Sequence, residues 1–317
     1  MNSKVTIIGA GNVGATIAYA LTLKEVASEI VLIDINKDKA DGEAMDISQG
    51  AAFISSTKIH SGDYPDAFGS GLVIITSGMG RKPGQSRLDL AQTNSEILMS
   101  ITPQITKYAP DALYLIVSNP VDILTYVFTK YSGIPSERII GSGTILDSAR
   151  LHEYLAAHFN VNPQNVNAHV LGEHGDSSFI PWSCINIANV PADEYSKYLL
   201  NANKHFTPVD KEEAIDYVRN SGGYIIKRKG ATFYAVSALL GYLCQCLHSE
   251  QVTVQDLSTV LNGEYGITDV ALSLPTLVGS SGVVNKIMLP LNAEEEAALH
   301  ASADKLKEII KSLNLTY

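Results

Sequence analysis

The sequence predicts an α/β fold, in which a doubly wound parallel sheet is followed by an α+β domain. Three observations favour this fold. In the first half of the 317 residues, short apolar runs alternate with helical periods. The first run passes directly into a glycine-rich turn and a helix, and the alternation ends past residue 142. Alternating β and α segments favour parallel strands joined by right-handed crossover helices.

The first half contains apolar runs separated by helical patterns. We expect strands at residues 4–8, 30–34, 56–60, 72–76, 113–117 and 138–140, and helices near 12–24, 38–48, 90–107 and 121–131. In a sheet of this kind, ligands bind outside the carboxyl ends of the strands. Three informative stretches fall there: the glycine turn, residue 34, and the loop after strand 72–76.

The glycine turn joins the first strand to the first helix. Val5–Ile8 leads into Gly9-x-Gly11-x-x-Gly14. Gly9 permits the tight turn, Gly11 lets the backbone approach a pyrophosphate, and Gly14 lets the helix pack closely on the strand. The helix N-terminus then offers free N–H groups and about half a positive charge to that pyrophosphate.

An acidic residue ends the second strand. Asp34 follows Ile30–Ile33 and lies about 20 residues beyond the turn, where a carboxylate binds the adenosine ribose hydroxyls. Asp34 would repel a 2′-phosphate, and no arginine follows it. We therefore predict NAD(H) as the cofactor and residues 1–142 as an NAD-binding Rossmann domain. The alternative for Asp34 is a solvated carboxylate at a strand end.

Residues 143–317 are expected to form a substrate-binding, catalytic α+β domain, with a hinge at residues 141–143. A helix is predicted over 144–159, and a long helical region over 210–248 with an interruption at Gly222-Gly223. Residues 265–290 predict antiparallel strands with turns at 279–282. Residues 293–313 predict a helix whose first turn is acidic and whose end carries lysines, as the helix dipole favours.

Composition excludes several classes of partner. The formal charge of −10 argues against nucleic acid and anionic membranes. No apolar stretch approaches the ~20 residues of a membrane span, and the first strand begins too early for a signal peptide. Cys244-x-Cys246 lies in an apolar helical run without a second pair at zinc spacing, and the histidines show no ligand spacing. We expect reduced core thiols, no metal and a cytoplasmic location.

Several segments carry candidate active-site residues, each with a plainer alternative. The loop 77–87 holds glycines, a proline and three cations, and it predicts a mobile basic lid or else an ordinary surface loop. Asn119 ends a strand beside a proline, which turn chemistry also explains. Asp147 and Arg150 share a helix face at i, i+3 spacing, as a surface ion pair would. His174 stands between glycines in a loop, and its sequence alone leaves function open.

Together these residues fit one reaction. A nicotinamide-dependent alcohol dehydrogenase needs a proton acceptor, a substrate anchor and a group that polarises the carbonyl. His174 suits the first role, because a partner such as Asp147 would fix its tautomer and raise its pKa. Arg150 suits the anchor, since guanidinium pairs bidentately with carboxylate. Arg87 on the lid suits the third role when the lid closes and water leaves.

The assembled motifs resemble the L-lactate/malate dehydrogenase family over essentially the whole chain. They are GAGNVG at 9–14, SNPVD at 118–122, GSGTILDSAR at 141–150, GEHGDS at 172–177 and KGAT at 229–232. The resemblance implies that His174 is the acid/base and that Asp147 orients it. It also implies that Arg150 binds the substrate carboxylate and that Arg87 polarises the carbonyl.

The same resemblance implies further contacts. Asn119 would bond the reacting oxygen, and Thr232 would line the pocket. The implied substrate is a small 2-keto or 2-hydroxy acid, and the implied assembly is a homotetramer or homodimer. The residues expected to bind the cofactor are Gly9, Gly11, Asn12, Val13, Gly14, Asp34 and Asn119.

Two departures from the family pattern bear on substrate and regulation. Arg81 occupies a lid position that carries glutamine in the lactate dehydrogenases of the family and arginine in its malate dehydrogenases. A guanidinium closed over a methyl group would be an unpaired desolvated charge, which costs about 3–5 kcal/mol. Because of the whole-chain resemblance, we predict pyruvate as the main substrate. The alternative is that the enzyme acts on oxaloacetate, or on both acids. His152 and Asn167 replace a basic pair of the fructose 1,6-bisphosphate-activated enzymes, so we predict no strong sugar-phosphate activation.

The sequence also contains features of two other classes of protein. Tyr126-x-x-x-Lys130 matches the Tyr/Lys spacing of short-chain dehydrogenases, although the glycine turn has the wrong spacing for them. A non-catalytic NAD-binding module would keep the glycine turn and Asp34. It would have no need of His174 together with its predicted partners.

Overall fold

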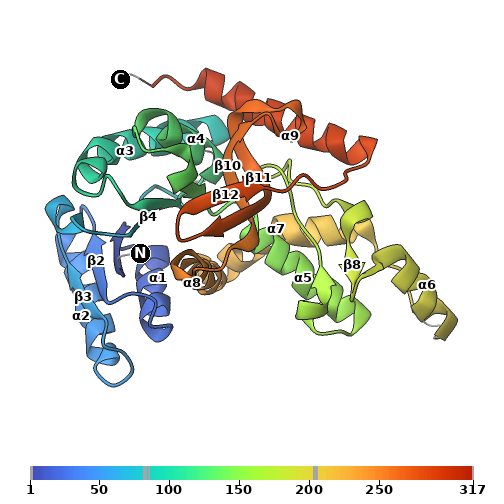
Figure 1. Cartoon of the computed structure of the whole chain (residues 1–317), viewed down its shortest axis with the longest axis horizontal. Helices are drawn as coiled ribbons and strands as arrows, with labels where there is room; N and C mark the ends of the chain where they lie inside the picture. The colour runs from blue at the N-terminus through green and yellow to red at the C-terminus, as the bar shows by residue number, and fades with distance from the viewer. Residues whose placement is uncertain (1–2, 81–83, 85, 203–205, 316–317) are drawn as a thin grey trace.

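The computed structural model of the chain describes residues 3–80, 84, 86–202 and 206–315. Within this part, the main sheet has nine strands in the order β12-β11-β10-β6-β5-β4-β1-β2-β3 (Figure 1). The order 3-2-1-4-5-6 of the parallel strands is that of a doubly wound dinucleotide-binding sheet, so the predicted fold class is confirmed. The parallel strands are β1 (Lys4–Ile8), β2 (Glu29–Ile33), β3 (Lys58–Ser61), β4 (Leu72–Ile75), β5 (Leu113–Ile116) and β6 (Ile139–Gly141).

Helices cover both faces of the parallel strands. The helices α1 (Asn12–Leu23) and α2 (Lys37–Ala51) share one apolar core with the sheet, and α3 (Arg87–Tyr108) and α4 (Val121–Tyr131) share the other. In β4, Leu72 and Ile74 belong to the first core, whereas Val73 and Ile75 belong to the second. Burial on both faces explains why these strands are continuous apolar runs.

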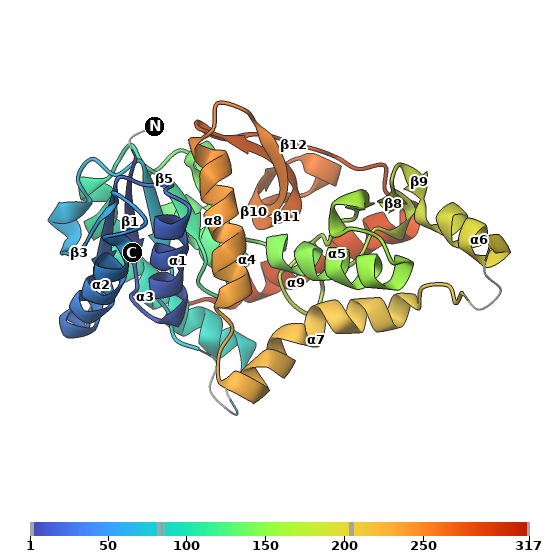
Figure 2. The same ribbon diagram turned by 90° about the horizontal axis from the view of Figure 1, so that it is seen from below.

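The second half extends the same sheet and adds a lobe beside it. Figure 2 shows α7 running beside α5 in this lobe and α8 packed along α1, and contacts between these elements agree. The helices are α5 (Ile145–Phe159), α6 (Ala192–Ala202), α7 (Lys211–Lys229), α8 (Tyr234–His248) and α9 (Ala293–Ser312). The strands are β10 (Thr253–Asn262), β11 (Thr268–Gly279) and β12 (Gly282–Lys286) in the main sheet, and β7 (Val166–Asn167), β8 (Asn186–Ile187) and β9 (Val190–Pro191) in a small antiparallel sheet.

Short 3-10 helices complete the described chain. They occupy Tyr64–Ala67, Ser136–Arg138, Pro163–Asn165, Trp182–Cys184 and Glu264–Gly266.

The predicted interruption of the helical region at Gly222-Gly223 is wrong. Helix α7 continues through both glycines and ends at Gly230, which caps it in the left-handed region with φ +88°. Glycine weakens a helix without forcing it to end, whereas a left-handed residue ends it. The prediction also missed β10 and α6, although the turn expected at 279–282 does separate β11 from β12.

The glycines at the expected hinge are packed tightly. Gly141 ends β6, and its Cα approaches Ser258 of β10 so closely that a Cβ would lie 2.9 Å from that side chain. Gly143 has φ +53° and a similar contact with Ser258 and Ser273. Close approach to the antiparallel strands therefore requires glycine at these positions.

Two further sequence expectations concern burial and membranes. Cys244 and Cys246 are free thiols buried in α8. No helix within residues 3–80, 84, 86–202 and 206–315 is long and apolar enough to cross a membrane.

Candidate active site

The glycine turn has the geometry of a dinucleotide cradle. Gly9 has φ +105°, and its N–H donates to the Ile33 carbonyl at 2.7 Å, which ties the turn to β2. A Cβ on Gly14 would overlap the carbonyl oxygen of Gly9, so α1 packs on β1 only because this residue is glycine. At Gly11 a Cβ would meet no heavy atom within 4 Å, which leaves open space where the turn faces a ligand groove.

A groove of about 640 Å³ lies along this turn. Its lining includes Gly9, Gly11 and Asp34, together with Thr76 and Gly78 after β4. The Asp34 carboxylate accepts hydrogen bonds from the N–H groups of Ala10 at 2.7 Å and Asn36 at 2.8 Å, so it is held at the carboxyl ends of β1 and β2. Nearby Lys37 pairs with Asp63 at 2.7 Å, which leaves the negative charge of Asp34 to face the groove.

A second cavity, of about 450 Å³, adjoins the groove. The two share Thr76, Gly78 and Met79 in their linings, so a dinucleotide that begins at Asp34 can extend into the second cavity. Predicted site residues from distant parts of the chain meet there. They are Val13, Arg87, Asn119, Asp147, Arg150, His174 and Thr232.

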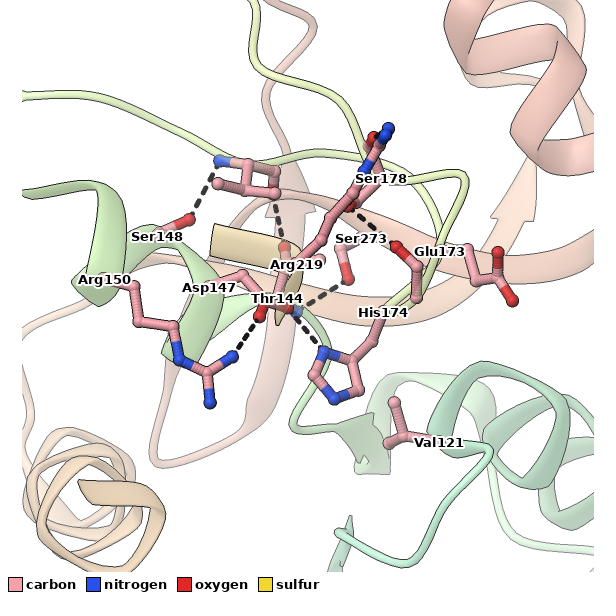
Figure 3. A network of polar contacts seen from close by, with 12 residues as sticks. Val121, Thr144, Asp147, Ser148, Arg150, Glu173, His174, Ser178, Arg219 and Ser273 are labelled. Carbon is pink, nitrogen blue, oxygen red and sulfur yellow. Dashed lines mark hydrogen bonds and ion pairs between the residues drawn. The ribbon is translucent and has the colours of Figure 1, made fainter. Parts of the chain in front are cut away.

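Asp147 joins the two central residues of this cavity. Its Oδ2 lies 2.5 Å from His174 Nδ1, and its Oδ1 accepts from Arg150 Nη1 at 2.8 Å (Figure 3). The side chains are 6%, 27% and 13% exposed for Asp147, His174 and Arg150, respectively. The i, i+3 pair is therefore not the exposed surface ion pair that its spacing alone allowed.

Ser273 of β11 binds both segments that carry the Asp147–His174 contact. The Thr144 N–H, at the start of α5, donates to Ser273 Oγ at 3.0 Å (Figure 3). Gly172 and Ser273 exchange backbone hydrogen bonds of 3.1 and 3.0 Å. The helix that carries Asp147 and the loop that carries His174 are thus both fixed to the same point of the sheet.

Electrostatics favour a protonated His174. The Coulombic attraction of Asp147 is the largest cause that raises the pKa of His174 to about 9, and it outweighs desolvation by burial, which acts in the opposite direction. Since Nδ1 contacts Asp147, Nε2 is the nitrogen left for a substrate. At neutral pH the imidazolium can therefore donate a proton from Nε2.

Asp122 fixes the backbone of His174. The His174 N–H donates to Asp122 Oδ2 at 2.7 Å, and Asp122 is almost completely buried at the start of α4. Burial raises the pKa of Asp122 to about 6. This residue was not among the predicted site residues, although it belongs to the SNPVD motif.

Arg87 lies at the cavity but its guanidinium contacts protein carboxylates. Nη1 lies 3.1 Å from Glu173 Oε1, and Nη2 lies 2.5 Å from Asp176 Oδ2. Arg87 is the first residue of α3, where Ser86 caps the helix by accepting from the Asp89 N–H at 3.0 Å. These two acidic partners were not predicted from the sequence, although both flank His174 in GEHGDS.

Two further predicted residues, Asn119 and Thr232, also lie at the cavity. Asn94 of α3 fixes both the loop after β4 and Asn119, because its Nδ2 donates to the carbonyls of Met79 at 3.0 Å and Asn119 at 2.6 Å. Thr232 lies between α7 and α8 and lines the cavity. Arg81, predicted to face the substrate side chain, lies outside the described residues.

One cation was not anticipated. Arg219 of α7 lines the cavity and donates to the Ser178 carbonyl, which joins α7 to the loop after His174 (Figure 3). Helix α7 gave no sequence motif at this position. Within the described residues, no group of three or more His, Cys, Asp or Glu side chains is arranged to hold a metal ion.

Tyr126 and Lys130 form structural contacts with a carboxylate. Tyr126 Oη donates to Asp269 Oδ1 at 2.9 Å, and Lys130 Nζ lies 2.7 Å from the same oxygen. These contacts tie α4 to the start of β11. The pair therefore has a structural partner, which removes the support for a short-chain dehydrogenase.

Known proteins match nearly the whole chain. Residues 3–141 match the model of the lactate/malate dehydrogenase NAD binding domain, and residues 144–315 match that of the lactate/malate dehydrogenase alpha/beta C-terminal domain. An L-lactate dehydrogenase of Thermoanaerobacter sp. (strain X514) is 46% identical over 99% of this chain and 100% of its own length. An L-lactate dehydrogenase of Clostridium botulinum is 45% identical over 98% of this chain and 96% of its own.

Solved structures agree. The minor L-lactate dehydrogenase from Enterococcus mundtii, in its ligands-bound form, superposes with a TM-score of 0.92 at 37% identity and covers 99% of each chain. The L-lactate dehydrogenase from Clostridium thermocellum gives a TM-score of 0.87 at 39% identity, covering 99% of this chain and 100% of its own.

Proposed function

The chain belongs to the lactate/malate dehydrogenase family, and we propose from this premise that it interconverts pyruvate and L-lactate with NADH and NAD as cofactor. The observation that carries the proposal is the carboxylate of Asp147, which contacts both His174 and Arg150 in one cavity beside the glycine turn. A nucleotide-binding module has no use for a histidine whose pKa is raised to about 9 in contact with that carboxylate.

The cofactor fits the residues present. The open space at Gly11 and the free N–H groups at the start of α1 suit a pyrophosphate, and Asp34 suits ribose hydroxyls while repelling a 2′-phosphate. When bound, NADH supplies the hydride for the carbonyl carbon. We assign Gly9, Asn12, Val13, Gly14 and Asn119 to the same binding surface.

The substrate is held by its carboxylate. Arg150 lines the cavity, and only one of its terminal guanidinium nitrogens contacts Asp147, so the guanidinium can also pair with a 2-keto acid. Asn119 and Thr232 line the same cavity, and we assign them to the reacting oxygen and the pocket wall. This places the substrate carbonyl toward Nε2 of His174.

Proton transfer is the work of His174. The imidazolium donates its Nε2 proton to the carbonyl oxygen as hydride reaches the carbonyl carbon, which yields the hydroxyl of lactate. Asp147 holds the ring orientation and stabilises the cation before the transfer. In the oxidation of lactate, neutral His174 accepts the hydroxyl proton.

Arg87 must exchange partners to polarise the carbonyl. Its guanidinium is paired with Glu173 and Asp176, both in the loop of His174, and Arg87 lines the same cavity as His174. In a site from which water is excluded, a cation beside the developing oxyanion stabilises the transition state. We assign that role to Arg87.

Pyruvate is favoured over oxaloacetate by the relatives, which are L-lactate dehydrogenases over nearly the whole chain. We propose that Arg81 contributes to the substrate side of the pocket without making oxaloacetate the main substrate. We also propose a cytoplasmic homotetramer or homodimer with no strong response to sugar phosphates. The ring of His152 supports the last point, because its Nε2 already donates to the Ala168 carbonyl at 2.8 Å.

The test of the proposed function is His174→Asn, assayed with pyruvate and NADH. We expect kcat to fall by three orders of magnitude or more, on the scale of the loss of a general acid. Binding of NADH, followed by its fluorescence, should remain within a few-fold of the original. A variant that kept its activity would refute the assignment of His174.

A further inference from the structure

A buried carboxylate that the mechanism does not use lies beside α5. The side chain of Asp256, in β10, is only 5% exposed. Its Oδ1 lies 2.9 Å from Nδ1 of His169, and its Oδ2 accepts a hydrogen bond from Ser148 Oγ at 2.5 Å. Burial of a carboxylate is costly unless it is paired and hydrogen-bonded, and these two partners meet that requirement.

Ser148 connects this carboxylate to the active site. It directly follows Asp147 in α5, and its Oγ also accepts from the Val170 N–H at 2.9 Å (Figure 3). Val170 stands four residues before His174, and its carbonyl accepts from Thr144 Oγ1. One hydroxyl therefore joins the helix that carries Asp147 to the segment that leads to His174.

The carboxylate fixes the direction of both hydrogen bonds of Ser148. An ionised carboxylate only accepts, so the hydroxyl hydrogen points to Asp256 and a lone pair remains for the Val170 N–H. Such a charge-assisted bond is about twice as strong as one between neutral groups. Adjacent residues of a helix point in different directions, so Ser148 and Asp147 face different surroundings. The contact with Asp256 therefore restrains α5 from a side that Asp147 does not face.

His169 is the cationic partner of this carboxylate. Its Nδ1 contacts both oxygens of Asp256, at 2.9 and 3.1 Å. Desolvation by burial is the largest single influence on the pKa of His169 and lowers it, but the hydrogen bond and the attraction from Asp256 together raise the pKa above its ordinary value. Asp256 therefore favours the imidazolium, and the two side chains stabilise each other in the buried site.

The consequence for catalysis rests on the proposed function, in which Asp147 orients His174. Asp147 is the charge that acts most strongly on His174, so a displacement of this carboxylate would change the histidine. We propose that Asp256 and His169 are positioning residues for this contact. Together they hold Ser148, and Ser148 holds the turn of α5 that carries Asp147. Neither Asp256 nor His169 lines the catalytic cavity, so both act through Asp147.

The first test compares Asp256→Ala, which removes both contacts, with Asp256→Asn. Asparagine keeps an oxygen for Ser148 and offers an N–H to a neutral His169 ring. We expect Asp256→Ala to lower kcat for pyruvate reduction about ten- to a hundredfold, because a displacement of about 1 Å in a catalytic site has an effect of that order. Asp256→Asn should restore most of this loss.

The pH profile separates positioning from a general loss of stability. In Asp256→Ala, the pH above which kcat/KM for pyruvate falls should move to lower values, because a displaced Asp147 raises the pKa of His174 less. In Asp256→Asn this falling limb should lie near its original pH. NMR titration of the His174 ring should show the same shift in the absence of substrate.

Ser148→Ala tests the connection itself and removes a single oxygen, so it remains informative if Asp256→Ala does not fold. Its falling limb should also move to lower pH. Ser196→Ala is the matched control. Ser196 is a half-buried serine of α6, and its Oγ donates to the Ala192 carbonyl of its own helix at 2.8 Å. Ser196→Ala should leave both kcat and the falling limb unchanged.

The double variant His169→Ala/Asp256→Ala tests the role of the histidine. Because His169 acts through Asp256, the double variant should lose no more of kcat than Asp256→Ala alone. A further large loss in the double variant would contradict the role assigned to His169.

A lowered unfolding temperature in Asp256→Ala and Ser148→Ala, without movement of the falling limb, would overturn the inference, because it would indicate a purely structural role. Failure of the unaltered enzyme to reduce pyruvate would instead refute the proposed function. An unmoved NMR titration of His174 in Ser148→Ala would overturn this inference alone.

Discussion

Asp147 Oδ2 lies 2.5 Å from Nδ1 of His174, and this contact determines both the orientation and the protonation of the histidine. The carboxylate occupies the first turn of α5, where a helix dipole favours negative charge. Its other oxygen is paired with Arg150 at 2.8 Å, so one buried side chain aligns the proton donor with the substrate anchor.

The pH dependence of the reaction should follow His174. Because its pKa is raised to about 9, the imidazolium is present at neutral pH and is lost as pH rises through that value. The kcat/KM for pyruvate reduction should therefore be flat near neutrality and fall above about pH 9. Lactate oxidation needs the neutral ring, so its kcat/KM should rise with pH and level off above about pH 9.

Asp147→Asn should shift these profiles. Attraction by Asp147 is the largest cause of the raised pKa, so its removal should move the falling limb of pyruvate reduction toward lower pH by about one unit or more. The rising limb of lactate oxidation should move in parallel. If the limb in pyruvate reduction stayed in place, Asp147 would not be the group that sets the pKa.

Arg150→Lys should weaken substrate binding. An ammonium keeps the charge but cannot form two parallel hydrogen bonds to a carboxylate. We therefore expect a fall in kcat/KM for pyruvate that corresponds to a loss of about 2–4 kcal/mol in transition-state binding. Most of the loss should appear as a higher KM. The control is the affinity for NADH, measured by fluorescence titration, which should change little. An equal loss of NADH affinity would indicate a misfolded site.

Gly14→Ala should lower stability, whereas Gly11→Ala should weaken cofactor binding. A Cβ on Gly14 would overlap the Gly9 carbonyl oxygen, so we expect a loss of about 1–3 kcal/mol in the free energy of unfolding, measured by denaturant titration. Gly11→Ala has open space and should leave stability within about 0.5 kcal/mol, yet it should weaken NADH binding. Unchanged NADH affinity in Gly11→Ala would contradict the placement of the pyrophosphate at this turn.

The sequence predicted those parts of the fold and site that depend on local patterns. The strand–turn–helix at Gly9–Gly14 follows from apolar periodicity and from backbone needs that only glycine meets. Asp147 and Arg150 could be placed on one helix face by their spacing alone. The contact of Asp147 with His174, in contrast, was an inference from chemistry and resemblance, because the loop and the helix are brought together by tertiary contacts, such as those of both with Ser273 of β11, that leave no local pattern.

Other features depend on long-range contacts that leave no local pattern. The ion pairs of Arg87 with Glu173 and Asp176 join residues that are distant in the chain, so neither periodicity nor spacing could reveal them. Gly222-Gly223 was misjudged for a related reason. A glycine pair predicts weak helix, but tertiary packing of α7 on α5 holds the helix together through it.

The most direct test of the proposed function is a side-by-side measurement of kcat/KM with NADH for pyruvate and oxaloacetate at neutral pH. We expect a preference for pyruvate, because Arg150 can bind its single carboxylate and pyruvate has no second carboxylate that needs a cation. A preference for oxaloacetate of about a hundredfold, ~2.7 kcal/mol in transition-state binding, would contradict it. That result would assign Arg81 to a second substrate carboxylate and make the enzyme a malate dehydrogenase.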